Sequence, residues 1–340
     1  MSIGRRKRDH VELSVSGEVD YTRATGFGDY RLLHEALPEL DLEEVDTSCT
    51  LLGRTFDFPL FVSSMTGGYT EAGAVNAILA EFCEEYNLPM GVGSQRIMLE
   101  EPETASSFSV VRERAPGAFI AANIGGAQLV GGLPDEQVRL LTESIAADAV
   151  IVHLNPLQEL MQPEGDRNFR GVEEGIARLV EQAGCPVIVK ETGAGISART
   201  GRSLLELGVQ VLDTSGAGGT SWARIENLRQ ESGSARHDFD NWGIPTVTCV
   251  LGLQELRADY NFEMIASGGV RSAFDIAKAF CLGADFAAAA QPLIRAIHED
   301  GADGLRKHYL GWREDLRTIL LLTGCRTPAE WGPNHLRAVG

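Results

Sequence analysis

Four polar side chains that could do chemistry follow directly on an apolar stretch of this chain. Residues 150–152 form a β-branched run typical of a buried strand. The polar residues that come next are His153, Asn155, Gln158 and Glu159. A single carboxylate beside amides suits one hard cation such as Mg²⁺, which bridges to phosphate oxygens, and this predicts Glu159 as a metal ligand. His153 is either a general acid or base, or a satisfied histidine at the end of a strand.

A lysine ends a second apolar run. Lysine is scarce, at four of the 30 basic residues, and Lys190 stands immediately after the run at 187–189. Its amine is expected to point into the mouth of the fold. There it could form a Schiff base, neutralise a phosphate, or face the N1 and C2 carbonyl end of a flavin. The alternative is a core lysine paired with Glu191 or a neighbouring carboxylate.

Two glycine-rich turns favour a phosphate-bearing cofactor. The stretches "SGAGGT" at 215–220 and "SGGVRS" at 267–272 each lead from an apolar run toward a helical stretch. Backbone N–H groups in such turns, together with the helix dipole, make an anion site. One glycine run is weak evidence, because turns need glycine in any case. Two runs at corresponding positions favour phosphate binding.

A basic cluster lies near the start of the chain, in the stretch "RRKRD" followed by His10. One interpretation is a solvated basic arm. The other is an arm that folds over the mouth of the fold and meets a substrate phosphate with arginine and lysine, with Arg96 of "GSQR" as its partner.

Eight short apolar runs alternate with helical stretches from about residue 58 onward. This alternation predicts a parallel α/β fold, and eight units favour a closed (β/α)8 TIM barrel over an open doubly wound sheet. The predicted strands are 59–64, 89–94, 118–125, 149–155, 186–191, 209–216, 262–269 and 284–290. Because the polar motifs follow these runs, the carboxyl ends of the strands would gather them at one catalytic face.

Three parts of the chain are expected. They are an N-terminal extension without strong periodicity at 1–57, which carries the basic arm, a barrel at 58–325 that would bind the cofactor, and a C-terminal tail at 326–340. Helices are predicted between strands at 76–86, 135–148, 171–183, 202–208 and 272–283, and two closing helices at 293–301 and 310–324.

Composition limits the class of partner. A formal net charge of -18 and a pI near 4.8 predict repulsion from nucleic acid and anionic membranes. Six scattered cysteines suggest reduced core residues, and the absence of an 18-residue apolar run or a leader predicts a soluble cytoplasmic protein. Nucleophile-elbow, zinc-helix and Walker motifs are absent, so hydrolysis of esters, peptides or nucleotides has no support.

The motifs, taken in order from about residue 5 to 325, resemble the type 2 isopentenyl diphosphate isomerases, an FMN-dependent family. The matching stretches are "RKRDH", "MTGG", "GSQR", "NIGGAQ", "HLNPLQE", "PEGDRNF", "VKETGAGIS", "SGAGGTSW" and "ASGGVRS". The pair "HLNPLQE" and "PEGDRNF" is the most specific, whereas the glycine turns alone would indicate only an FMN-dependent barrel.

The resemblance implies an enzyme that interconverts isopentenyl and dimethylallyl diphosphate with FMN, Mg²⁺ and a reductant such as NADPH. The implied FMN contacts are Ser64, Met65, Thr66, Ser94, Asn123, Lys190, Ser215, Thr220, Gly268, Gly269, Val270, Arg271, Ala290 and Gln291. The implied substrate contacts are Arg6, Lys7, His10, Ser94, Gln95, Arg96, His153, Asn155 and Gln158. Glu159 matches the metal ligand of the family, and Glu226 resembles a second acidic residue near the diphosphate.

Moving a double bond requires one proton to be delivered to an alkene and another to be removed, without net redox change. Protonating an unactivated alkene needs a positioned acid and a pocket closed to water. Our hypothesis makes flavin N5 the acid and base, while Lys190 sets the charge of the reduced flavin. Gln158 would position the reacting carbons or relay a proton, and His153 is the remaining catalytic candidate.

Two other functions stay open on sequence grounds. One is another FMN-dependent barrel, of the hydroxy-acid oxidase or dehydrogenase type, and the other is a non-catalytic flavin or phosphate sensor. The resemblance further suggests a homo-oligomer, a tetramer or an octamer. The stretch 163–169 is expected to be a lid or a support on the flavin side whose charges pair among themselves.

Overall fold

Eight parallel strands close into a barrel in this computed structural model, which describes residues 3–16, 18–230 and 235–339, and only the backbone of residues 3–8, 16 and 70. They follow one another around the barrel in chain order, and the last pairs with the first: β4 (Leu60–Val62), β5 (Met90–Gly91), β6 (Ile120–Gly125), β7 (Ala149–Leu154), β8 (Val187–Glu191), β9 (Val211–Asp213), β10 (Glu263–Ala266) and β11 (Phe286–Ala289). The predicted (β/α)8 barrel is confirmed, and the open doubly wound sheet is excluded. The strands are shorter than the predicted runs, which extend past the strands at one end or at both.

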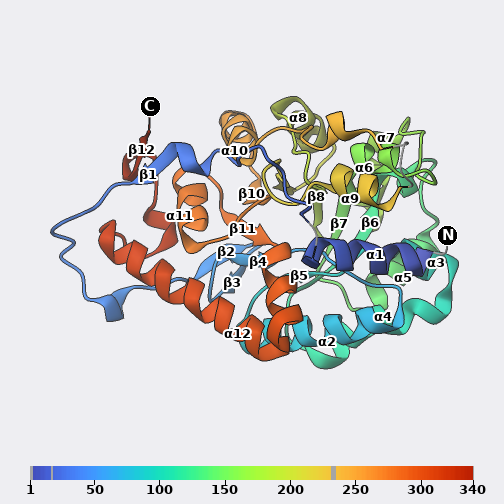
Figure 1. The fold of residues 1–340 in the computed structure, drawn as a ribbon, viewed down its shortest axis with the longest axis horizontal. Coiled ribbons are helices and arrows are strands. Elements are labelled where there is room, and N and C mark those ends of the chain that lie inside the picture. The colour runs from blue at the N-terminus through green and yellow to red at the C-terminus, as the bar shows by residue number, and fades with distance from the viewer. Residues whose placement is uncertain (1–2, 17, 231–234, 340) are drawn as a thin grey trace.

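Helices surround the barrel (Figure 1). Those after the first barrel strand are α2 (Thr70–Glu85), α3 (Arg96–Glu100), α4 (Ser106–Arg114), α5 (Asp135–Glu143), α6 (Pro156–Met161), α7 (Val172–Gln182), α8 (Ala198–Glu206), α9 (Trp222–Arg229), α10 (Thr246–Gln254), α11 (Ala273–Cys281) and α12 (Gln291–Leu322). The five helices predicted between strands correspond to α2, α5, α7, α8 and α11. The two predicted closing helices are parts of α12, which is bent at Asp300 and Gly301, where the backbone leaves helical geometry.

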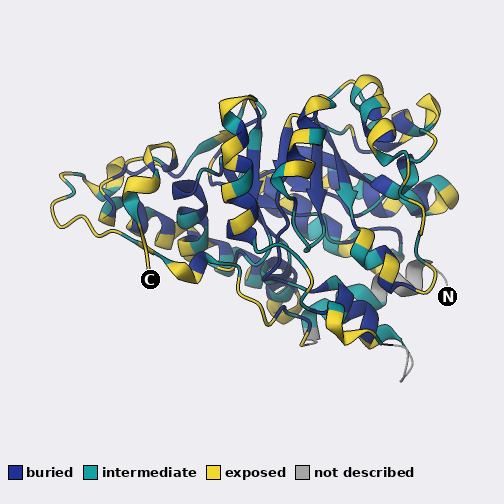
Figure 2. Ribbon diagram, turned by 90° about the horizontal axis from the view of Figure 1, so that it is seen from above, coloured by how far each residue is buried: buried dark blue, intermediate teal, exposed yellow. Residues whose placement is uncertain are grey.

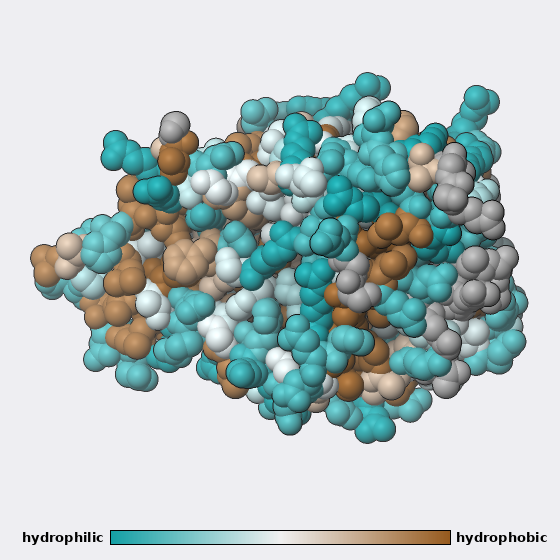
Figure 3. Space-filling view, in the orientation of Figure 1, coloured by the Kyte–Doolittle hydropathy of each residue, from teal (hydrophilic) through white to brown (hydrophobic). Residues whose placement is uncertain are grey.

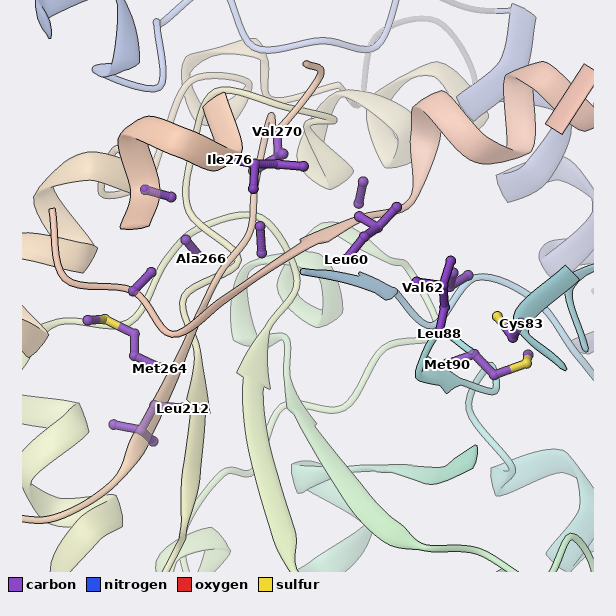
Figure 4. Close-up of a cluster of buried hydrophobic side chains, with 14 of the residues drawn as sticks. Leu60, Val62, Cys83, Leu88, Met90, Leu212, Met264, Ala266, Val270 and Ile276 are labelled. Atoms are coloured by element: carbon purple, nitrogen blue, oxygen red, sulfur yellow. The ribbon is translucent and has the colours of Figure 1, made fainter. Parts of the chain in front are cut away.

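Side chains along each strand alternate between two apolar clusters, as the two-residue period of a strand requires. Ile151 lies inside the barrel with residues of the other strands, whereas Val150 and Val152 face the helices. Val62 on β4 and Met90 on β5 also face the helices, and Figure 4 shows both close to Cys83 in the last turn of α2. Figure 2 shows the result as buried strands inside helices whose outer faces are exposed.

A hairpin closes the amino-terminal end of the barrel. It consists of β2 (Cys49–Leu51) and β3 (Arg54–Phe56), which pair antiparallel. Leu51 and Phe56 are fully buried and belong to the cluster inside the barrel. The ring of Phe56 stands edge-on to Phe119 and Phe286, with ring centres 5.8 Å away in both cases. The apolar filling is therefore sealed at this end, and the opposite end is left for chemistry.

The N-terminal extension contains more structure than its weak periodicity indicated. Helix α1 (Ile3–Ser16) packs against α9 and α12, and β1 (Tyr30–Leu32) pairs antiparallel with β12 (Leu336–Ala338) of the predicted tail. The weak periodicity did not indicate this helix, because its stability comes from contacts that a local pattern does not reveal. On the face shown in Figure 3, hydrophobic side chains gather toward the end that holds β1, β12 and α11. The boundaries at 57 and 325 stay a prediction.

Candidate active site

The inward-facing positions of the strands carry apolar side chains inside the barrel and polar side chains at the carboxyl ends of the strands. Two residues beyond Ile151 and Ile188 stand His153 and Lys190, which are register partners on β7 and β8. The same step from inward residues of other strands leads to Ser63, Asn123, Asp213 and Ser267. A polar layer therefore lies on top of the apolar filling, at the carboxyl-terminal mouth.

One cavity at this mouth lies over the ends of β8 to β11 and β4, with an empty volume of about 1020 Å³ that includes open solvent. Eleven of the residues predicted to contact FMN line it: Ser64, Met65, Lys190, Ser215, Thr220, Gly268, Gly269, Val270, Arg271, Ala290 and Gln291. We refer to it as the first cavity.

Its lining fits a flavin nucleotide. The two glycine turns lie backbone against backbone, since a Cβ on Gly219 would lie 2.5 Å from the amide nitrogen of Gly269, and one on Gly268 would lie 2.1 Å from the oxygen of Gly216. A side chain at either position would force the two turns apart and disrupt a cavity wall that is rich in backbone N–H groups. Ser64 Oγ is buried and has no hydrogen-bond partner among the described residues, so a polar ligand atom would satisfy it.

A second cavity, of about 930 Å³, lies beside the first over the ends of β5 to β7. Predicted substrate and metal residues gather here: His10, Ser94, Arg96, His153, Asn155, Gln158 and Glu159. Thr66, Ser94 and Asn123, which were predicted as FMN contacts, line this second cavity and not the first. The two cavities share a wall made of His10, Ser64, Met65, Lys190, Thr192 and Trp222.

The ring of His153 is oriented by Asn123. The Asn123 amide nitrogen donates to the backbone oxygen of Val92 (2.9 Å), which turns its Oδ1 toward His153 Nδ1 at 2.8 Å. Because this oxygen only accepts, Nδ1 of His153 carries the proton. With its ring held in this way, His153 lines the second cavity.

The start of α6 fixes the orientation of the polar side chains that follow His153. Pro156 occupies the first turn, where its missing N–H costs nothing. The Asn155 amide donates to Gln158 Oε1 (3.2 Å) and to Glu159 Oε1 (3.0 Å). The side-chain oxygen of Gln158 therefore accepts a hydrogen bond from Asn155, and the side-chain NH2 group of Gln158 points away from Asn155. Only 8% of Glu159 is exposed, so the structure places one oriented carboxylate in the second cavity.

The stretch 163–169 pairs with other elements, so the expectation that its charges pair among themselves was wrong. Asp166 Oδ2 accepts from Arg96 (3.2 Å) and from Gln128 (3.0 Å), and its backbone N–H donates to Glu159 Oε2 (2.8 Å). Arg167 donates to backbone oxygens at the end of α6. The stretch therefore borders the second cavity and holds Arg96 and Glu159 in place.

Lys190 is buried at the shared wall. Its amine donates to the backbone oxygen of Glu191. Of the core-lysine alternative, pairing with Glu191 or a neighbouring carboxylate, the structure retains the electrostatic attraction of Asp213 and Glu191. Burial lowers the pKa of the Lys190 amine, against the opposing attraction of Asp213 and Glu191. Burial likewise raises the pKa of Asp213, against the charge of Lys190 and the hydrogen bonds from Ser267 and Ser215. Such an amine releases its proton more readily than an exposed lysine.

Three predicted residues make contacts within the protein. Gln95 is fully buried, donates to the Leu141 oxygen (3.1 Å) and accepts from the Asn123 N–H (2.9 Å), and it lines neither cavity. Arg271 and Gln291 line the first cavity, and both bind the Asp20 carboxylate, at 3.0 and 2.9 Å. Gln95 therefore supports the wall from behind.

The N-terminal helix borders both cavities: His10 lines both, and Val11 and Ser14 line the first. His10 Nε2 lies 2.8 Å from Glu226 Oε1, and its ring stands edge-on to Trp222 at 5.0 Å. Glu226 is fully buried, which alone would raise its pKa, but His10 and Arg229 outweigh burial and hold the pKa of Glu226 below its usual value. The predicted contacts Arg6 and Lys7 are on the same helix, but their side chains lie outside the described part of the structure.

Sequence reasoning assigned no role to Asp213, Thr192 or Trp222. Asp213 carried a usable signal, because it stands two residues after the inward Val211 on an apolar strand, as His153 stands after Ile151. Thr192 and Trp222 line both cavities, and their roles depend on how the turns after β8 and β9 pack.

The described residues contain neither a cluster of metal-binding side chains nor a helix that could span a membrane. Within those ranges, no three His, Cys, Asp or Glu side chains gather to hold a metal ion. A single carboxylate that shares Mg²⁺ with a diphosphate, as predicted for Glu159, needs no such group. No described helix has both the length and the apolar character required to cross a lipid bilayer.

Solved structures share the fold. A flavocytochrome b2 mutant matches with a TM-score of 0.72 at 20% identity, over 98% of this chain and 85% of that one. A soluble mutant of the membrane-associated (S)-mandelate dehydrogenase from Pseudomonas putida matches with a TM-score of 0.66 at 13% identity, over 97% and 91% of the two chains. At these identities the likeness concerns the fold alone.

A parallel barrel with two glycine turns and a buried polar mouth defines a class, the flavin-binding (β/α)8 enzymes, and a model of the FMN-dependent dehydrogenase family matches residues 147–338. Within this class, the chain belongs to the isopentenyl-diphosphate delta-isomerase family. A member from Chlorobium luteolum is 45% identical over 98% of this chain and 96% of its own length. One from a Nostoc species is 43% identical over 94% and 91%. The family predicted from the motifs is confirmed, and the hydroxy-acid oxidase or dehydrogenase alternative is set aside.

Proposed function

We propose that this chain interconverts isopentenyl and dimethylallyl diphosphate, using reduced FMN and Mg²⁺. The observation that carries the proposal is the shared wall: a cavity that fits a flavin nucleotide meets a cavity lined by oriented polar groups, and Lys190 and Trp222 line both. Relatives that are 41–45% identical over nearly the whole chain bear the name isopentenyl-diphosphate delta-isomerase, which supports the choice of substrate.

The first cavity would hold FMN. The glycine turns after β9 and β10 would bind its phosphate through backbone N–H groups, with Arg271 beside them, and Ser64 and Lys190 would meet the ring. Reduced FMN supplies a proton donor and acceptor at N5 and an electron-rich ring face. Lys190, as a buried cation, would favour the anionic form of the reduced ring.

The second cavity would hold the diphosphate substrate. Arg96, His10 and Ser94 line it and would bind the diphosphate, with Arg6 and Lys7 of the N-terminal helix as further contacts. Glu159 would hold one Mg²⁺ that is shared with phosphate oxygens. These contacts lie away from the reacting carbons, so their binding energy would serve to orient the alkene.

Gln158 and His153 would act on the hydrocarbon end. The NH2 group of Gln158 would position the reacting carbons or relay a proton, and His153 Nε2 would exchange a proton or bind the substrate. A tertiary cation survives only where water is excluded, and the N-terminal helix, which brings His10 to both cavities, would act as the cover. We also propose NADPH as reductant, a homo-oligomeric assembly and a cytoplasmic location, on the family resemblance.

The test is direct. Purified protein should be yellow, should bleach with NADPH, and only then should convert isopentenyl diphosphate in the presence of Mg²⁺. A colourless protein that takes up no FMN would overturn the proposal, and an oxidised product under anaerobic conditions would point to an oxidoreductase.

The metal role of Glu159 has its own test. Glu159→Gln keeps the hydrogen bond from Asn155 but removes the charge, so the Mg²⁺ concentration at half-maximal rate should rise at least about tenfold. Glu173→Gln, which changes an exposed carboxylate on α7, serves as a matched control. An unchanged Mg²⁺ requirement in Glu159→Gln would remove Glu159 as the ligand.

A further inference from the structure

One buried cation lies where three segments meet beside the second cavity. Arg229, at the end of α9, has a side chain that is 7% exposed. Its guanidinium donates to Glu226 on the same helix, and it lies 3.7 Å from Asp9 Oδ2 and 3.6 Å from Glu164 Oε1. These partners belong to α9, to helix α1 and to the connection after β7.

The contacts to α1 come as a pair. Asp9 faces Arg229, and the next residue, His10, bonds to Glu226 at 2.8 Å. Glu226 and Arg229 are one helical turn apart on α9, so consecutive residues of α1 meet a carboxylate and a guanidinium on one face of that helix. Figure 1 shows α1 running past α9 at the mouth of the barrel.

Charge balance makes the guanidinium essential to this junction. Asp9, Glu164 and Glu226 are all acidic, and Glu226 is fully buried. Without Arg229, the buried carboxylate of Glu226 would keep His10 alone among the described side chains, and the acidic groups of the other two segments would repel it. Removing one partner of a buried ion pair is costly because the remaining charge stays desolvated.

Arg229 lines neither cavity, so it acts on a ligand only through what it holds. His10 lines both cavities, and the basic stretch 5–8 is on the same helix. We infer that Arg229 is a positioning residue that fastens helix α1 over the mouth and so completes the substrate cavity. Only the kinetic readout below rests on the proposed isomerase function.

The test compares Arg229→Gln and Asp9→Asn with Arg178→Gln, a control that breaks an exposed ion pair on α7. Trypsin cleavage within residues 5–8 reports directly on how firmly α1 is docked. In Arg229→Gln we expect cleavage about tenfold faster than in wild type and a KM for isopentenyl diphosphate raised about tenfold, with kcat lowered less than about threefold. Asp9→Asn should shift both in the same direction by less, and Arg229→Lys should restore part of the loss.

Unchanged cleavage in Arg229→Gln would overturn the inference even if KM rises, because Arg229 would then act through Glu226 alone. If Arg229→Gln fails to fold by circular dichroism, Asp9→Asn decides: cleavage at the wild-type rate would overturn the inference, and faster cleavage would support it. A wild-type protein that binds FMN but does not isomerise the substrate would remove the proposed function, while cleavage would still decide the role of Arg229.

Discussion

Glu191 offers a quantitative test of the electrostatics beneath the active site. Its carboxylate is 6% exposed and accepts hydrogen bonds from the backbone N–H groups of Thr192 (2.6 Å), Ala194 and Gly195 (3.2 Å). Burial nevertheless raises the pKa of Glu191 to about 7, because desolvation outweighs those bonds and the nearby charge of Lys190. The turn that it holds forms part of the wall between the two cavities.

The perturbation is Glu191→Gln, which keeps an oxygen acceptor but cannot ionise. The folded-state pKa of Glu191 lies above the reference value of 4.5, so the folded protein holds a proton that the unfolded chain loses. The resulting stability is fully present below pH 4.5 and is lost as pH rises through about 7. The difference corresponds to about 3 kcal/mol. The stability of wild type relative to Glu191→Gln should therefore fall by about 3 kcal/mol across this range and then level off.

Urea unfolding of the apoprotein, followed by circular dichroism from pH 4 to pH 8, measures this difference. Glu174→Gln, which changes an exposed carboxylate on α7, serves as the control and should track wild type at every pH. The reasoning is refuted if wild type and Glu191→Gln differ by the same free energy at every pH. A carboxylate that stays charged in the fold would produce that result.

Two further predictions concern the floor and the wall of the site. Phe56→Ala, at the sealed end of the barrel, should lower the free energy of unfolding by about 3–5 kcal/mol in urea titrations and leave KM unchanged. Thr55→Ala, at an exposed position of the same strand, is the control. Equal unfolding midpoints for the two variants would contradict the role of the hairpin. Asn123→Ala removes the acceptor that fixes the His153 ring, a loss of about 1–3 kcal/mol, so turnover should fall roughly 5- to 150-fold. Ring ¹⁵N shifts should then show a mixture of His153 tautomers, and a ring that keeps its proton on Nδ1 would count against that assignment.

The barrel could be predicted because its signals are local. Each strand is an apolar run that ends in a polar motif, and that order alone places His153, Lys190 and the glycine turns at one end. Gathering these residues required no knowledge of individual contacts. The predicted site residues line one cavity or the other except Gln95, Glu226 and the two whose side chains are not described, Arg6 and Lys7, and Thr66 and Asn123, predicted to contact FMN, line only the second. Their roles stay a prediction.

What could not be predicted depends on partners far along the chain. Asp166 binds Arg96, 70 residues away, and Asp9 meets Arg229 on α9. Such pairs follow from how loops pack, and no spacing rule encodes them. Helix α1 shows the same limit, since its stability comes from α9 and α12. The role of Asp213 could have been predicted, because the inward alternation of β9 ends on it.

The pairing of β1 with β12 can form only after nearly the whole chain has been synthesised. Residues 30–32 find their partners only at 336–338, about 300 residues later. At roughly 5–20 residues per second, a ribosome needs about 15–60 seconds to make that stretch. The barrel also closes late, because β4 pairs with β11, which leaves the ribosome after all the other barrel strands. For that time each nascent chain presents open strand edges, so slower elongation prolongs the exposure and, at a given rate of initiation, leaves more unclosed barrels in need of chaperones at once.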